Sequence, residues 1–181
     1  MVLQKRFFVA AMATGVMLAG FFLQGHRGPL GWVTEGGAHA PVWPRPTDTA
    51  DRVRAVGLEL LPMEGSVLHF HVHLDVFYRG QPVTVPANVG VVPGMGFSAL
   101  HSHADAGLIH VESPTRREFR LGQFFTEWGV PLGGASAWVN GHRISDPAGL
   151  VLHDHQQIVV TYGTPPARIP TSFPSLPAEM M

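Results

Sequence analysis

Six of the chain's 11 histidines lie between residues 69 and 110, and most of them recur at alternate positions. In chain order these six are His69, His71, His73, His101, His103 and His110. Alternation is the period of a β-strand, in which side chains i and i+2 point to the same face. Neutral imidazole is the commonest metal ligand in proteins, and its unperturbed pKa of about 6.5 leaves it largely deprotonated at neutral pH. The pattern therefore predicts a metal site built from histidines on adjacent strands.

Strand geometry limits how many of these histidines can bind one ion. Residues i and i+2 lie roughly 6.6 Å apart and three alternate residues span about 13 Å, whereas two nitrogens on one zinc are only about 3.3 Å apart. Two neighbouring imidazoles can lean toward one ion, but a third in the row is strained. We expect two ligands from residues 69–73 and one or two from residues 101–110, with the others orienting ligands or holding a second ion.

Each histidine group has a carboxylate nearby. Glu112 alternates with His110, while Asp75 and Asp105 closely follow the other two groups. We interpret Asp75, Asp105 and Glu112 as acceptors for the N–H groups of the ligating imidazoles. The alternative is that the histidines merely line the solvated face of a sheet. Their repeated spacing beside carboxylates favours the metal site.

The residues that the chain lacks narrow the choice of metal. The sequence contains no cysteine, which excludes thiolate zinc sites and cysteine-ligated copper centres. Histidine ligation leaves copper or zinc as the predicted ion. Met63 and Met95 carry soft thioethers, but we expect both to fill the core. We expect His142 to play no part in the site, and His153-Asp154-His155 to form a polar turn.

An apolar segment near the N-terminus predicts a membrane anchor. Residues 7–23 carry no charge and follow Lys5 and Arg6. As a helix these 17 residues would extend roughly 25 Å, close to the roughly 30 Å hydrocarbon thickness of a bilayer. The basic pair favours a cytoplasmic N-terminus, which places the rest of the chain on the extracytoplasmic side of the cell membrane. A cleaved signal peptide is the alternative, although Ala38-His39-Ala40 lies too far downstream for the usual cleavage motif.

Composition predicts one domain and divides the chain into four parts. The chain is 45% hydrophobic with a formal net charge of -1, which suits a single core and provides no basic surface for nucleic acid. We expect an anchor or signal peptide over 1–24, a Gly/Pro-rich linker over 25–47, a His-rich β domain over 48–163 and a Pro-rich tail over 164–181.

The β domain is predicted to be a sandwich or partly open barrel with one short amphipathic helix. Strands are expected at 67–79, 82–86, 89–92, 97–101, 108–112, 117–121, 135–140, 142–145 and 157–162. Asn140-Gly141 predicts a hairpin turn. An aromatic stripe over residues 121–128, ended by Gly129, predicts the helix. Asp48 or Thr49 could cap a further short helical segment before residue 60.

Several of these motifs resemble an uncharacterised family of prokaryotic membrane-anchored proteins. The family has an H-x-H-x-H-L strand, an L-H-[ST]-H block, G-x-I-H-x-E-S and L-G-x-F-F-x-x-W-G. The matching residues begin at His69, Leu100, Gly107 and Leu121, and the likeness covers roughly residues 57–163. Ala104 stands where an acidic residue is expected directly after the second block. The resemblance implies a membrane-anchored protein and brings no activity with it.

These observations predict a membrane-anchored, extracytoplasmic domain that captures or transfers copper or zinc. One alternative is a metalloenzyme in which three histidines leave an open position on the ion and Glu112 or Asp105 transfers a proton. The other is a structural subunit of a membrane complex. The sequence names no protein partner.

Overall fold

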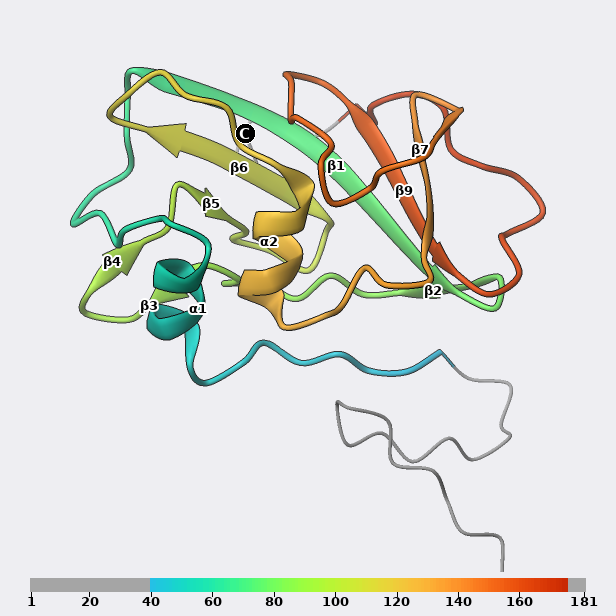
Figure 1. The fold of residues 1–181 in the computed structure, drawn as a ribbon, viewed down its shortest axis with the longest axis horizontal. Helices are drawn as coiled ribbons and strands as arrows, with labels where there is room; N and C mark the ends of the chain where they lie inside the picture. Colours follow the sequence, from blue (N-terminus) through green and yellow to red (C-terminus); the bar gives the residue numbers. More distant parts are fainter. Residues whose placement is uncertain (1–39, 176–181) are drawn as a thin grey trace, which may run out of the picture. The chain divides into compact units, whose positions relative to one another are not determined.

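The computed structural model describes residues 40–175, which form a mixed β-sheet with two short helices (Figure 1). The elements in chain order are α1 (Thr49–Ala55), β1 (Leu68–Tyr78), β2 (Gln81–Val83), β3 (Val91–Val92), β4 (Gly96–Phe97), β5 (Leu100–His101), β6 (Leu108–Ser113), α2 (Leu121–Trp128), β7 (Ser136–Val139), β8 (His142–Ile144) and β9 (Gln157–Tyr162). The prediction of a mainly β fold is confirmed for this part of the chain.

The long strand β1 organises the main sheet. The sheet has 7 strands in the order β5-β6-β1-β9-β7-β8, with β2 also paired to β1. β1 runs antiparallel to β6 and parallel to β9, so it lies in the interior of the sheet. The predicted turn at Asn140-Gly141 joins β7 to β8, with φ of 49° and 83° at its two residues. Positive φ at both positions is the geometry of a tight hairpin turn.

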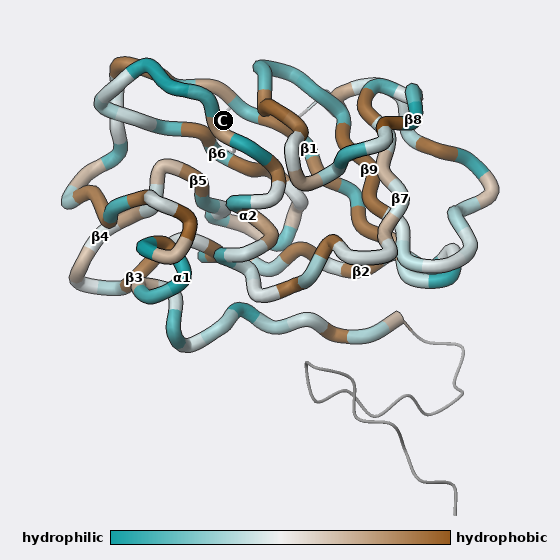
Figure 2. The backbone as a smooth tube through the Cα atoms, in the orientation of Figure 1, coloured by the Kyte–Doolittle hydropathy of each residue, from teal (hydrophilic) through white to brown (hydrophobic). Residues whose placement is uncertain are grey.

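One face of the sheet is apolar and belongs to the core. Val72, Leu74 and Val76 are buried on β1, where they alternate with the histidines. Figure 2 shows a hydrophobic stretch along β9, the parallel neighbour of β1. Helix α2 is drawn in front of the sheet in Figure 1 and contacts β5. Its aromatic stripe is fully buried, and Gly129 ends it in the left-handed conformation, as the sequence predicts.

The architecture differs from the expected sandwich or partly open barrel. Apart from the large sheet, residues 40–175 contain only the two-stranded ribbon β3–β4, and no barrel closes. Two short helices accompany the sheet: α2, which the helical spacing of the aromatic residues in 121–128 predicts, and α1, which lies in the segment expected to be helical before residue 60. Segment 117–121 is not a strand; it makes an isolated bridge between Arg120 and Val151 before α2 begins.

Residues outside the predicted domain also pack against it. Trp43, which composition places in the linker, is buried, and its ring contacts the rings of Trp128 and Tyr162. Phe173, from the predicted tail, contacts the rings of His73 and His155. The predicted anchor at residues 7–23 lies outside the described residues. Within 40–175, no helix has the length and apolar character needed to cross a bilayer.

Candidate metal centre

The register of three adjacent strands brings the predicted histidines together. β1 and β6 pair so that His71 lies opposite His110 and His69 lies opposite Glu112. On the other side of β6, β5 places His101 opposite His110 (Figure 1). Paired residues project to the same face of a sheet. These five side chains therefore share the face that alternates with the apolar core residues of β1.

Four donor atoms converge in what we call the inner cluster, which consists of His69, His71, His110 and Glu112. Nε2 of His71 lies 3.3 Å from Nε2 of His69 and 3.1 Å from Nδ1 of His110. Oε1 of Glu112 lies 3.2 Å from Nδ1 of His110 and 3.3 Å from Nε2 of His69. Ligand atoms at tetrahedral zinc are also about 3.3 Å apart. The inner cluster thus has the dimensions of a metal site.

A second group, which we call the outer cluster, consists of His101, His103 and Glu64. Nε2 of His103 lies 3.1 Å from Nε2 of His101 and 3.3 Å from Oε1 of Glu64. The ring of Phe97 packs against both imidazoles, with centroid separations of 5.5 and 6.2 Å. The two clusters adjoin, because ligand atoms of His101, His103 and His110 also lie within 4.8 Å of one another.

Burial keeps two of the candidate ligand histidines neutral. Burial is the largest cause that lowers the pKa of His71 to about 4; the charges of His110 and His69 act in the same direction, and those of Glu112 and Asp154 oppose it. Burial likewise lowers the pKa of His101 to about 4, against the opposing effects of the Ser98 carbonyl and Glu112. A neutral imidazole presents a lone pair to a cation, so both rings can bind a metal at neutral pH.

Glu112 provides a buried negative charge beside these rings. Burial alone raises the pKa of its carboxyl, but the hydrogen bond with His110 and the charges of His101, His69 and His110 outweigh that effect, so the pKa is lower than usual. The sequence predicts that Glu112 accepts a hydrogen bond from a ligand. In the structure its oxygen lies among the donor atoms, so Glu112 can ligate the ion directly.

A hydrogen bond fixes the tautomer of His101. Its Nδ1 lies 2.9 Å from the carbonyl oxygen of Ser98, which can only accept a hydrogen bond. Nδ1 therefore carries the proton of the neutral ring, and Nε2 carries none. Ser98 is held in turn by Glu127, whose Oε1 accepts from the Ser98 hydroxyl at 2.7 Å. Glu127 is fully buried on α2, and burial raises its pKa to about 8. A protonated carboxyl thus supports the loop before β5.

His73 points to the same face but lies outside both clusters. Its Nδ1 lies 3.0 Å from Oε1 of Gln157, and its Nε2 lies 3.1 Å from the carbonyl oxygen of Ala106. Both partners are acceptors, because the amide nitrogen of Gln157 donates to Asp75 at 2.9 Å. Both nitrogens of His73 therefore face oxygen acceptors, and a neutral ring with one N–H can donate to only one of them. Neither nitrogen belongs to a cluster, in keeping with the steric limit on three ligands from one strand.

The remaining predicted residues have structural contacts. Asp105 accepts a hydrogen bond from the backbone N–H of Ala87 at 2.5 Å, and Asp75 lies beside Gln157 and His73. Asp154 and His155 contact the backbone of His71 through hydrogen bonds of 3.3 and 2.8 Å. Their turn therefore lies beside the site, but the side chains of 153–155 are exposed and belong to none of the metal-binding groups among the described residues.

Sequence reasoning missed Glu64 and Glu127. Glu64 is a lone carboxylate in an irregular segment, and contacts between distant parts of the chain, including the bridge between Leu61 and Phe97, bring that segment near His103. Glu127 lies on the predicted helix, but the sequence gives no sign that it is buried. Met63 and Met95, expected in the core, are 72% and 62% exposed because they lie in irregular segments at the surface.

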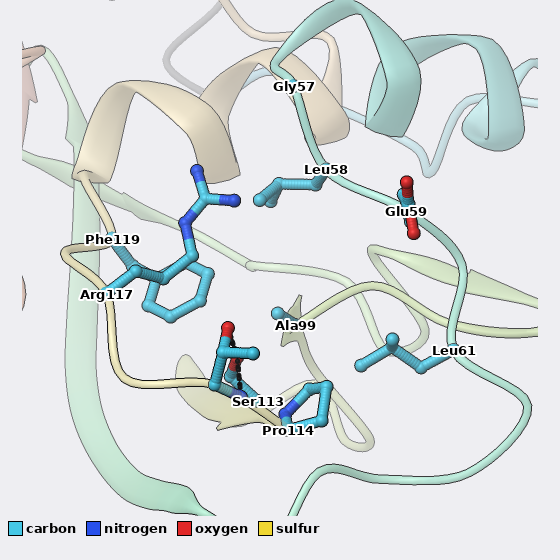
Figure 3. Close-up of a pocket in the computed structure, with 10 residues that line it drawn as sticks. Gly57, Leu58, Glu59, Leu61, Ala99, Ser113, Pro114, Arg117 and Phe119 are labelled. Atoms are coloured by element: carbon cyan, nitrogen blue, oxygen red, sulfur yellow. Dashed lines mark hydrogen bonds between the residues drawn. The ribbon is translucent and has the colours of Figure 1, made fainter.

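A separate cavity lies near the helices and contains no histidine. It has a volume of about 290 Å³, and its lining includes Leu58, Arg117 and Phe119 (Figure 3). Arg117 reaches toward Leu58 in this view, and Ser113 and Pro114 lie at the opposite side. The lining of the cavity contains the guanidinium of Arg117 and the carboxylate of Glu59 but no metal-binding group of the described residues.

Comparison with protein-family models, with curated proteins and with solved structures finds no match to this chain.

Proposed function

We propose that this protein is a membrane-anchored, extracytoplasmic protein that captures or transfers copper or zinc. The observation that carries the proposal is the convergence of three imidazole nitrogens and one carboxylate oxygen with neighbouring separations of 3.1–3.3 Å. Shared protons could produce the same separations, and a metal ion would displace those protons on binding. The neutral imidazole of His71 and the buried carboxylate of Glu112 attract a cation.

Partial exposure of the site supports capture or transfer over a closed structural role. The side chain of His69 is 50% exposed, whereas those of His110 and Glu112 are 7% and 4% exposed. An ion in the inner cluster would therefore meet solvent on the side of His69. An exposed side chain that can release and rebind the ion at the surface provides a route for exchange of the ion with another metal carrier.

The proposed location depends on the N-terminal segment. Residues 7–23 form an uncharged apolar run after Lys5 and Arg6, which supports a single membrane span with the metal domain outside. We propose copper or zinc as the ion because both metals accept imidazole and carboxylate donors.

Metal analysis of the untagged protein tests the proposal. Purified chain should contain copper or zinc, or bind added Cu²⁺ or Zn²⁺ stoichiometrically. Replacing His71 and His103 together with alanine should abolish stoichiometric binding because each cluster loses a ligand. His142→Ala is the matched control, since His142 is exposed on β8 and belongs to neither cluster. Equal loss in both variants, or no binding by the unaltered protein, would contradict the proposal.

A further inference from the structure

We infer that the domain holds a second metal ion beside the first, at an outer site formed by His101, His103 and Glu64. This inference rests on the proposed function, since it assumes that the inner cluster binds metal. The outer site has its own ligands, and we assign it the role of the first site that an incoming metal ion meets.

The outer site has three donors that the inner cluster does not need. Nε2 of His103 lies 3.1 Å from Nε2 of His101 and 3.3 Å from Glu64. Ligand atoms of Glu64 and His101 lie within 4.8 Å of each other. The two separations at His103 are close to the roughly 3.3 Å between ligands of one tetrahedral ion. The three groups can therefore approach one cation, beside His110 and Glu112 of the inner cluster, whose ligand atoms also lie within 4.8 Å of a ligand atom of His101.

His101 is built as a ligand. It is fully buried, its Nδ1–H donates to Ser98, and its Nε2 points toward His103. Fixing one ring nitrogen by a hydrogen bond is the usual way in which proteins orient a metal-binding imidazole. A histidine that merely lined a solvated face would need neither burial nor a fixed tautomer.

Each cluster also has its own negative charge. Glu112 lies among the inner donors and Glu64 among the outer donors. A carboxylate at each position offsets the charge of one divalent ion and reduces the repulsion between two neighbouring ions. His110 separates the clusters, because its ring contacts both His71 and His103.

Exposure distinguishes the two sites. In the outer cluster the side chains of His103 and Glu64 are 42% and 47% exposed, so two of three ligands face solvent. In the inner cluster only His69 is exposed. The outer ion should therefore exchange with solution faster, and an arriving ion would meet the outer site first.

Zinc stoichiometry tests this inference in the untagged full-length chain, solubilised in detergent. Native mass spectrometry should find two zinc ions in the unaltered protein and in His142→Ala. His103→Ala combined with Glu64→Gln should leave one ion, and His69→Ala should also leave one. All substituted side chains are exposed, and circular dichroism would verify folding.

The outcomes separate the inference from the proposed function. A single zinc in the unaltered protein, lost on substitution of His69, would overturn the second site and leave the proposed function intact. Two zinc ions in the His103→Ala, Glu64→Gln variant would overturn the assignment of the outer ligands. If the unaltered protein bound neither zinc nor copper, the proposed function itself would fail.

Release kinetics provide a second measurement on the same samples. A chelator in excess should remove zinc from the unaltered protein in two phases, and the fast phase should be absent from the His103→Ala, Glu64→Gln variant. Release of both ions in one phase would overturn the role of the outer site as entry point.

Discussion

The two histidines at the boundary between the clusters and the protein interior, His71 and His101, are kept uncharged by burial. We predict that NMR titration of the metal-free protein will show both rings neutral at pH 6, with midpoints near 4. Their folded pKa lies below the value of 6.5 expected in the unfolded chain, so they contribute stability above pH 6.5 that is lost as the pH falls toward 4. A midpoint near 6.5 for His71 would contradict the prediction.

The contribution of Glu127 to stability has the opposite pH dependence. Burial raises its pKa from 4.5 to about 8, so the folded state holds a proton that the unfolded state releases. Its contribution is fully present below pH 4.5 and is lost as the pH rises to about 8. Glu127→Gln retains an acceptor for the Ser98 hydroxyl and cannot ionise. In urea unfolding of the metal-free proteins, the variant should gain stability relative to the unaltered chain across this pH range.

The difference in unfolding free energy between Glu127→Gln and the unaltered chain isolates the effect of Glu127 from that of the histidines, since both chains share every other titrating group. A difference in unfolding free energy that stays constant from pH 4.5 to 8 would show that Glu127 is not a buried acid. A metal-binding defect in Glu127→Gln would also show that Ser98 depends on the carboxyl to orient His101.

Among the elements, the ribbon β3–β4 positions the outer cluster. The bridge between Leu61 and Phe97 joins it to the segment that carries Glu64, through hydrogen bonds of 2.8 and 2.9 Å. Gly96 has φ of 132°, and a Cβ at this residue would overlap the carbonyl oxygen of Leu61. Gly96→Ala should therefore break the bridge, lower stability by about 1–3 kcal/mol and remove only the outer zinc ion.

Gly94→Ala is the matched control for this variant. Gly94 also has a positive φ, of 74°, but a Cβ there would meet no atom within 4 Å. It should cost about 1 kcal/mol and leave both zinc ions bound. Thermal unfolding and native mass spectrometry report the two effects. Retention of two zinc ions by Gly96→Ala would mean that the ribbon does not position Glu64.

Periodicity predicted the elements that carry the inner cluster because local spacing determines which face a side chain occupies. The alternation of β1 and β6 placed His69, His71, His110 and Glu112 correctly on strand faces, and the helical stripe predicted α2. Strand order is a property of long-range pairing, so the sequence could not show that β6 separates β1 from β5. For the same reason it gave no sign of Glu64, which reaches His103 through a bridge between distant segments.

At the scale of the whole molecule, the ligands tie together segments far apart in the chain. Glu64 precedes β1, while Glu112 lies near the end of β6. A ligand that binds only the folded state stabilises it by an amount that grows with its concentration. Metal binding should therefore stabilise β1, β5 and β6 together, so the occupancy of the site is expected to affect the stability of three of the sheet's 7 strands.

Deletion can separate the proposed membrane anchor from the proposed metal domain. Residues 1–39 include the apolar run of 7–23, whereas Trp43 and the described residues that pack around the sheet lie after residue 39. We predict that the full chain fractionates with membranes and resists extraction by high salt, because an apolar helix inserted in the bilayer is not held by charge. A chain that begins at residue 40 should be recovered in the soluble fraction and bind zinc with unchanged stoichiometry. Substituting two leucine or phenylalanine residues of 7–23 by lysine is the matched control, since it retains the length but should prevent insertion. Recovery of the full chain in the soluble fraction would remove the anchor from the proposed function and leave the metal site as it stands.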